Sequence, residues 1–430
     1  MLTLLLIIIF AIIVGAVTGL LPALPVYTAP FILYYFGHDL PLEYLMIFWL
    51  VAVSGSQFFG SISTISTKIP GEESSTVYLN DIDKLSIKQR NSLLYDTALG
   101  SFVAGVLSLG FVYLALSYIK STGILVFSSM NFQIACYTLA ILSFWLFSKN
   151  LLSTVGLILL GLFLGPKNNY ALPPAWYDIH SIFSGFTFYM IVLGTVIIPE
   201  LFLNRVEPES SDVKATNNKT FSILQGIKSS IIGIFTGLIP GPSAFLAALT
   251  AYKTAGKDLY KKIVAAETAN NASVITCTLP LLLLGLPINQ NTLLFSNLMD
   301  IRSIEITEKI FQTSIVPEFN IIQLVLLCSA LSLSIYFWLS THLIWLYTKF
   351  IESMHNKMKY IMFLIVGALV SLDIHNSDVT IYNYVTLLSV FSLMGFVLKK
   401  YKISPMPFLF SLILGDKIVW LYIQFFKINF

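Results

Sequence analysis

One stretch of sequence, Thr236-Gly237-Leu238-Ile239-Pro240-Gly241-Pro242-Ser243, interrupts an apolar run that extends from about residue 221 to residue 250. Two glycines and two prolines in this stretch cannot sustain a regular helix, because glycine favours other backbone conformations and proline lacks a donor N–H. A helix broken at membrane depth is tolerated where the freed backbone groups line a protected cavity. The stretch therefore predicts a broken membrane helix whose backbone is available to a ligand.

The composition indicates an all-α protein that crosses the membrane several times. The chain has 430 residues, of which 56% are hydrophobic and only 11% are charged. Soluble domains carry about 25% charged residues. The net charge of +3 reflects an asymmetry among the loops, so we expect the lipid bilayer as partner and no nucleic acid.

Apolar runs of about 20 residues predict spanning helices, and here they predict about 10 to 12 spans. The first run begins at Leu2 without a basic segment or a cleavage site, so we interpret it as a membrane helix and not as a removed signal peptide. The run 151–165 is short and fits a re-entrant segment, whereas 310–346 is long enough for one tilted helix or two pieces. The other candidate spans are 2–22, 44–65, 93–118, 122–147, 181–203, 222–249, 263–286, 360–372, 379–398 and 405–426.

Clusters of lysine and arginine near the ends of these runs predict the orientation. The clusters at 253–262, 349–359 and 399–402 are expected on the cytoplasmic side, and the loop 72–90 is weakly cytoplasmic. The stretch 373–378 contains no Lys or Arg and is expected outside.

The broken stretch has an earlier counterpart, Thr18-Gly19-Leu20-Leu21-Pro22. Each copy is followed by a second break at almost the same interval, because the distance along the chain from Pro22 to Pro70 differs by a single position from that between Pro240 and Pro287. The offset between the two pairs is about half the chain. Matched spacing favours a duplication over the alternative that Gly and Pro are simply frequent in membrane helices.

The duplication predicts two transmembrane repeats joined by a polar linker. We expect the first repeat over 1–203, the linker over 204–219 and the second repeat over 220–430. If 72–90 is cytoplasmic and 300–309 is external, the two repeats are inverted relative to each other.

Small and hydroxyl-bearing residues gather before the first Pro-Gly, over residues 54–64. Such a cluster suits either close helix packing or a polar cavity, and its position before Pro70-Gly71 favours a cavity. Lys68 stands beside this break, either as a counter-charge for a substrate or as a marker of the membrane interface.

A second polar cluster, Glu267-Thr268-Ala269-Asn270-Asn271-Ala272-Ser273, lies at the start of an apolar run. Buried amides are costly unless their hydrogen bonds are satisfied. Asn270 and Asn271 therefore either coordinate a cation such as Na⁺ through their oxygens or donate N–H groups to a carboxylate. The alternative is a helix boundary that is solvated at the interface.

Broken helices present N–H groups that suit an anion and carbonyl groups that suit a cation. The expected substrate-binding residues are therefore those at the breaks and in the two clusters: Gly19, Pro22, Ser61, Ser63, Thr64, Pro70, Gly71, Gly237, Pro240, Gly241, Ser243, Asn270, Asn271 and Pro287.

No arrangement for bond-making chemistry is visible in the sequence. The five histidines are scattered, and no HExxH, GxSxG or Walker motif occurs. Cys136, Cys277 and Cys328 lie in apolar runs without metal-ligand spacing and are interpreted as buried thiols. We therefore expect neither an enzyme nor a bound cofactor.

These motifs resemble the large membrane subunit of the tripartite tricarboxylate transporters. The family's Gly-Leu-Leu-Pro turn, its small-residue stretch and its Pro-Gly-Glu-x-x-Ser motif are matched at 19–22, 59–61 and 70–75. Its Gly-x-x-Pro-Gly-x-x-Ala and Glu-x-Ala-Asn-Asn-Ala motifs are matched at 237–244 and 267–272. Ala23 and Ile288 stand where the family usually has glycine, which bears on the identity of the substrate.

The resemblance implies an ion-coupled secondary transporter of a prokaryotic plasma (inner) membrane, working with a small membrane subunit and a periplasmic solute-binding protein. The leading hypothesis is a subunit that imports a small organic anion, tri- or dicarboxylate-like, on a Na⁺ or H⁺ gradient. The alternatives are a stand-alone carrier, a membrane scaffold or assembly protein whose polar clusters only pack helices, and, more distantly, a membrane-embedded enzyme.

Overall fold

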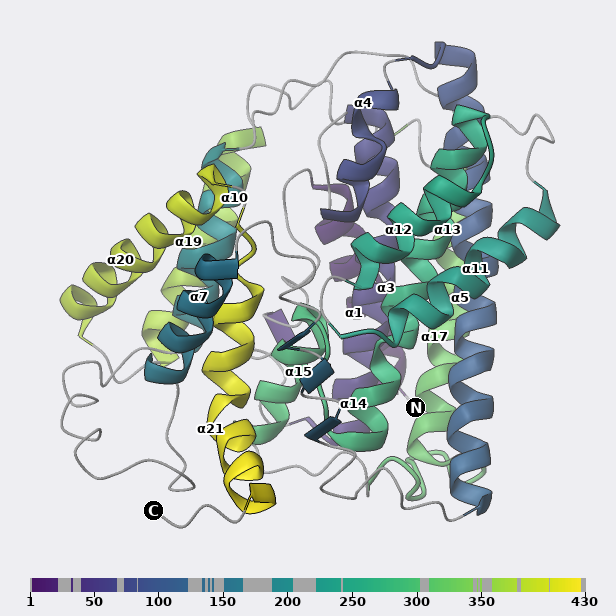
Figure 1. The fold of residues 1–430 in the computed structure, drawn as a ribbon. Helices are drawn as coiled ribbons and strands as arrows, with labels where there is room; N and C mark the ends of the chain where they lie inside the picture. The colour runs from purple at the N-terminus through teal and green to yellow at the C-terminus, as the bar shows by residue number, and fades with distance from the viewer. Residues whose placement is uncertain are drawn as a thin grey trace. The chain divides into compact units, whose positions relative to one another are not determined.

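A computed structural model shows the all-helical protein that the composition predicts (Figure 1). It describes residues 2–21, 32–33, 40–67, 73–82, 84–122, 134–135, 138–139, 141–142, 151–164, 188–203, 222–240, 243–301, 309–342, 346, 349, 358–376, 380–401 and 403–426. Within these ranges the only β-structure is an isolated bridge between Thr313 and Asn320. The chain divides into two compact units: unit 1 contains 1–123 and 204–361, and unit 2 contains 124–203 and 362–430.

Unit 1 begins with two long apolar helices, α1 (Leu2–Leu20) and α3 (Leu42–Thr67). After the predicted break at Pro70 come a 3₁₀ turn, η1 (Glu73–Val77), and the short α4 (Leu79–Ile82). The chain then enters α5 (Ile87–Thr122), whose 36 residues correspond to about 54 Å at the usual helical rise, more than the ~30 Å of a bilayer core.

The second half of unit 1 is more interrupted. Its first helix, α11 (Ile223–Gly237), ends inside the predicted broken stretch, and α12 (Ser243–Thr254) begins just after it. The 15 residues of α11 cover about 22 Å, which is too short for a crossing. The remaining helices are α13 (Leu259–Thr276), α14 (Thr278–Leu284), α15 (Gln290–Ile301) and α17 (Ile321–His342). The predicted break is therefore present.

Unit 2 packs helices through glycines. Its elements are α7 (Leu151–Leu164), α9 (Phe188–Val192), the π-helical η3 (Leu193–Ile197), α10 (Ile198–Leu203), α19 (Met358–Asn376), α20 (Ile381–Lys400) and α21 (Met406–Phe426). Gly161 of α7 lies against α21, where a Cβ would stand 2.5 Å from the Phe408 carbonyl oxygen. Gly395 of α20 lies equally close to η3, 2.4 Å from the Thr195 oxygen by the same measure.

Five helices among the described residues are long and apolar enough to cross a membrane: Leu2–Leu20, Leu42–Ser66, Gln89–Thr122, Ile321–His342 and Ile381–Lys400. In the run 310–346 the helix begins only at Ile321, after an irregular segment. Most of the candidate span 122–147 and all of the expected linker 204–219 lie outside the described residues. The number of spans and the repeat boundaries therefore stay predictions.

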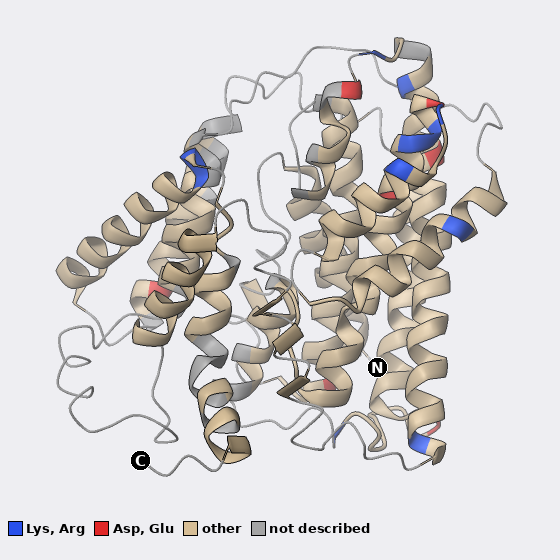
Figure 2. Ribbon diagram, viewed as in Figure 1, with Lys and Arg blue, Asp and Glu red and all other residues tan. Residues whose placement is uncertain are grey.

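Among the described residues of unit 1, most of the basic ones gather at the end where α5 and α13 begin (Figure 2). The Lys262 ammonium lies over the Tyr252 ring, 4.9 Å from its centroid, and Tyr252 contacts Asp81 in the loop 72–90. Two of the segments expected on the cytoplasmic side, 72–90 and 253–262, thus lie together. Which side of the membrane they face stays a prediction.

Candidate functional site

Helix α1 lies against α3 through two glycines one helical turn apart. A Cβ on Gly15 would stand 2.7 Å from the Ala52 carbonyl oxygen, and one on Gly19 would stand 2.5 Å from the Ser56 oxygen. Between them, Thr18 donates its hydroxyl to the Val14 carbonyl at 2.8 Å. Backbones this close accept only glycine at both positions, as is usual for small-residue contacts in membranes.

Helix α11 lies against α13 in the same manner. A Cβ on Gly233 would stand 2.2 Å from the Ala269 oxygen, and one on Gly237 would stand 2.7 Å from the Ser273 oxygen. Thr236 donates its hydroxyl to the Ile232 carbonyl at 2.8 Å, as Thr18 does to Val14.

The two contacts share the spacing of the two breaks. The glycine pairs of α1 and α11 are separated along the chain by the same interval as Pro22 and Pro240. The residues that they touch on α3 and α13 are separated by the same interval as Pro70 and Pro287. We call the stretch from Thr18 to Pro70 the first copy and the stretch from Thr236 to Pro287 the second copy. Equal offsets in contacts as well as in sequence support the expected duplication.

A hydrogen bond between buried amides joins the copies. Asn270 of α13 donates its Nδ2 hydrogen to Oε1 of Gln57 in α3 at 3.1 Å, and the two residues are 2% and 4% exposed. On the same helix, Asn271 donates to the Glu267 carbonyl at 3.0 Å, and Ser273 donates to the Asn270 carbonyl at 2.8 Å. Primary amides both donate and accept, so this pair is able to exchange its mutual bond for bonds to a ligand.

Buried hydroxyls lie on the same elements. Ser54 and Ser56 in α3, and Ser243 at the first residue of α12, are at most 5% exposed, and their Oγ atoms have no hydrogen-bond partner within the described part of the chain. An unsatisfied buried hydroxyl costs about 1–3 kcal/mol. These atoms mark places where a polar ligand would gain hydrogen bonds.

Several predicted site residues come together in this region. Gly19 and Gly237 form the close contacts, Asn270 and Asn271 lie on buried α13, and Pro287 is buried after α14. Pro240, which is partly buried, lies in the turn that follows α11.

Three predicted hydroxyl residues lie on buried α3 beyond Gln57. Ser61 and Thr64 donate to the Phe58 and Gly60 carbonyls of their own helix, which occupies their donor hydrogens, and Ser63 is fully buried. The remaining predicted residues, Pro22, Pro70, Gly71 and Gly241, lie outside the described residues, as does Lys68.

Several residues of this region are absent from the predicted site, among them Gln57 and Tyr78. Gln57 carries a usable signal, because it is an amide within a run that is otherwise apolar or small, and the cost of burial that singles out Asn270 applies to it equally. The hydroxyl of Tyr78 donates to the Glu267 carboxylate, a partner 189 residues away that no local pattern indicates.

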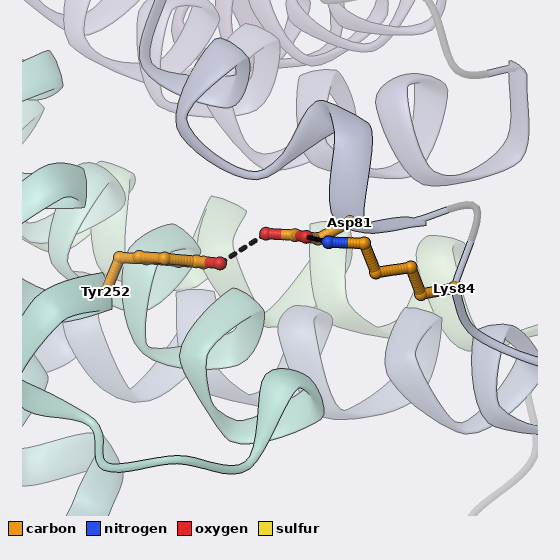
Figure 3. Close-up of polar contacts among 3 residues, drawn as sticks. All are labelled: Asp81, Lys84 and Tyr252. Carbon is orange, nitrogen blue, oxygen red and sulfur yellow. Dashed lines mark hydrogen bonds and ion pairs between the residues drawn. The ribbon is translucent and has the colours of Figure 1, made fainter.

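A charged cluster lies at the lysine-rich end, outside the predicted spans (Figure 3). Asp81 accepts hydrogen bonds from Tyr252 and from Lys84. Burial tends to raise the pKa of the Asp81 carboxyl, but the two hydrogen bonds and the charges of Lys84 and Lys262 outweigh it and hold that pKa below its usual value. Burial and the neighbouring Asp81 raise the pKa of Tyr252 to about 12.

A cavity of about 350 Å³ lies elsewhere, between the last turns of α5 and the start of α17. Lys120, Ser117 and Gln323 contribute to its lining, and none of the predicted site residues does. Within the described ranges, no group of three or more His, Cys, Asp or Glu side chains is placed to hold a metal ion.

The broken helices, the glycine contacts and the apolar spans define a polytopic helical membrane protein of the kind that carries solutes. The chain matches the tripartite tricarboxylate transporter TctA family over residues 5–410 and belongs to that family. The family resemblance seen in the sequence is thereby confirmed.

A curated relative is less informative about function. An uncharacterised 52.8 kDa protein from Agrobacterium vitis, described by its place in the TAR-I ttuC′ 3′ region, is 28% identical over 257 residues, and the match covers 54% of this chain. It spans about half (51%) of the relative's length. No solved structure matches the chain.

Proposed function

We propose that this chain is the membrane subunit of a secondary transporter that imports a small organic anion of the tri- or dicarboxylate class, driven by a Na⁺ or H⁺ gradient. Membership in the TctA family supports the transport role and the substrate class. The observation that carries the proposal is the buried hydrogen bond from Asn270 to Gln57, which lies where the two copies meet.

The chemistry of this region suits a carboxylate. Amide N–H groups of Asn270 and Gln57 and hydroxyl groups of Ser54 and Ser56 are donors, and carboxylate oxygens are acceptors only. Donors held in a water-poor interior bind an anion more strongly than they do in water. A carboxylate therefore replaces the bond between the two amides with stronger, charge-assisted bonds.

The proposed complex contains a small membrane subunit and a periplasmic solute-binding protein, with the inner membrane of a prokaryote as its location. The description of the family as tripartite supports these partners. Uptake that needs neither partner would identify a stand-alone carrier.

Uptake of labelled tri- and dicarboxylates into proteoliposomes tests the proposal. We expect accumulation by the wild-type chain with its partners when an ion gradient is imposed, and a decrease of about tenfold or more in Asn270→Ala, because a hydrogen bond to a charged group contributes about 1.5–3 kcal/mol. Ser334→Ala, on the exposed face of α17, is the matched control and should keep full uptake. Full uptake by Asn270→Ala would contradict the proposed site, and no accumulation of any carboxylate by the wild type would favour a scaffold.

The coupling ion is a separate part of the proposal. Asn270 and Asn271 are the proposed Na⁺ ligands, through amide oxygens, which suit a hard cation. Accumulation driven by a Na⁺ gradient at equal pH on both sides, and abolished in Asn271→Ala, would support sodium. Accumulation that follows only a pH gradient would assign the coupling to protons.

A further inference from the structure

A tyrosine and a carboxylate connect the segment after Pro70 with helix α13. Tyr78 directly follows η1, in the segment after the break at Pro70, and its hydroxyl donates to Glu267 on α13. The two residues are 1% and 2% exposed. The segment that follows Pro70 of the first copy thus contacts α13, the longest helix of the second copy.

Two aromatic rings connect the segment after Pro287 with helix α3. Phe295 of α15, in the segment after the break at Pro287, stacks on Trp49 of α3, with ring centroids 4.2 Å apart and planes at 9°. These residues are 0% and 2% exposed. The segment that follows Pro287 of the second copy thus contacts α3, the long helix of the first copy.

The two contacts correspond to each other under the duplication. The interval along the chain from Tyr78 to Phe295 equals the interval between the second prolines of the two copies. The interval from Trp49 to Glu267 is one residue longer than the interval that relates α3 to α13, so the position on α3 equivalent to Glu267 is Leu50, next to Trp49. Residues at equivalent or adjacent positions therefore form corresponding contacts, one through a hydrogen bond and one through aromatic stacking.

The contacts lie on opposite sides of the amide pair, because α3 and α13 run in opposite directions. The end of α3 leads to Tyr78, which reaches the first half of α13, and the end of α13 leads through α14 to Phe295, which reaches the first half of α3. Trp49 precedes Gln57 by eight residues, or about 12 Å of helix, and Glu267 precedes Asn270 by three, or about 4.5 Å. In Figure 1, α4, just beyond Tyr78, and α15 accordingly lie toward different ends of unit 1.

We infer that the Tyr78–Glu267 and Trp49–Phe295 contacts are the two gates of the site around Gln57 and Asn270, and that the structure has both gates closed. This inference rests on the proposed function. The Tyr78–Glu267 gate faces the lysine-rich end, which is expected to be cytoplasmic, and the Trp49–Phe295 gate faces the opposite end. In a chain built from two inverted copies, loosening one gate exposes the site on one side only.

Labelling of a single cysteine tests the two gates separately. The reporter is Gln57→Cys in the full chain with Cys136, Cys277 and Cys328 replaced by alanine, and the probe is a membrane-impermeant maleimide applied to right-side-out or inside-out vesicles without substrate. We expect Tyr78→Ala to increase the labelling rate several-fold from the side of the lysine-rich end only. Trp49→Ala should increase it several-fold from the other side only.

Matched variants separate gating from general damage. Tyr384→Ala removes a tyrosine that is bonded to Asp373 in unit 2, and Phe425→Ala removes an exposed ring of α21; neither should change labelling. If an alanine variant at a gate fails to insert, Tyr78→Phe and Trp49→Phe, which keep a ring, should give the same sidedness with smaller increases.

The inference is overturned if both gate variants increase labelling from one side, or if neither changes it. The readout needs no substrate, so it is independent of the proposed function. One-sided labelling by each variant supports the gates even if no carboxylate is transported. Transport without one-sided labelling refutes the gates and leaves the proposed function intact.

Discussion

At the scale of single residues, glycines have two functions that the sequence does not separate. Gly237 belongs to the predicted break, but the structure also places it in a backbone contact with Ser273 of α13. Gly15 and Gly233 serve only in helix–helix contacts. The sequence gives no signal for this role, because both residues lie inside regular helices. Local breaks can be predicted from residue types, whereas helix contacts need the neighbouring helix to be known.

Replacement of Gly237 by alanine tests the contact. The new Cβ would stand 2.0 Å from Thr276 Oγ1 and 2.7 Å from the Ser273 oxygen, so α11 must move away from α13. We expect Gly237→Ala to lower the thermal unfolding midpoint in detergent, corresponding to about 1–3 kcal/mol. Gly110→Ala is the matched control, because nothing lies within 4 Å of a Cβ there, and it should be neutral or slightly stabilising. An equal midpoint for both variants would contradict the packing.

The Asp81–Tyr252 pair predicts a pH dependence with two limits. Folding lowers the pKa of Asp81. The charged carboxylate therefore stabilises the folded state at pH values above the ordinary carboxyl pKa, and this stabilisation is lost as the pH falls through the pKa of Asp81 in the folded state. The pKa of Tyr252 is raised to about 12, so the stabilisation is present below the ordinary tyrosine pKa of about 10 and is lost as the pH rises through about 12.

We therefore expect Tyr252→Phe to be less thermally stable than the wild type between about pH 4 and pH 10, with a difference that shrinks outside this window. Thermal melts of both proteins across this range provide the measurement. Tyr401→Phe, at an exposed position, is the control. A difference that stays unchanged however far the pH falls below the ordinary carboxyl pKa would show that the effect of Tyr252 is not exerted through the carboxylate.

At the scale of the elements, the interrupted helices of the second copy are the most predictable feature. Two glycines and two prolines between 236 and 243 leave no regular helix, and α11 duly ends at Gly237. The amide pair is not predictable as a pair, because Gln57 and Asn270 are 213 residues apart and no sequence pattern specifies which buried groups meet. The irregular segment before Ile321 has a signal of its own, because Pro317 and Asn320 are typical of a helix boundary, although the run 310–346 includes it.

The start of α13 offers a test of how a local cap supports the buried helix. Asp258 precedes α13 and accepts a hydrogen bond from the Tyr260 backbone N–H at 3.0 Å. Asp258→Ala should destabilise the protein by about 0.5–2 kcal/mol, whereas Asp258→Asn keeps the acceptor and should retain most of the stability. Thermal unfolding in detergent measures both. A loss in Asp258→Asn as large as that in Asp258→Ala would show that charge, and not capping, is what matters.

At the scale of the whole molecule, the predicted inversion of the repeats has a direct test in unit 1. Ser86 is exposed at the start of α5, in the loop expected inside, and Glu318 is exposed in the segment before α17, near the first turn of α3. We expect Ser86→Cys and Glu318→Cys to react with an impermeant maleimide from opposite sides of the membrane. Reaction of both from the same side would refute the inverted arrangement.

No sequence pattern predicts the division into these two units. Both copies of the repeated motif lie within unit 1, and unit 2 combines segments from the middle and the end of the chain. Composition and motifs along the sequence group neighbouring segments together. They do not indicate that 204–361 packs with 1–123. The chemistry of the candidate site is thus gathered in one unit.

The separation of Gln57 from Asn270 also has a consequence for biosynthesis. Ribosomes add about 5–20 residues per second, so the 213 residues between these partners take about 10 to 40 s to make. During that interval α1 and α3 are already available to pair through Gly15 and Gly19, while Gln57 lacks its amide partner. The first copy therefore spends this interval without the amide that bonds Gln57 in the folded chain, so the buried hydrogen bond between the copies forms only late in synthesis.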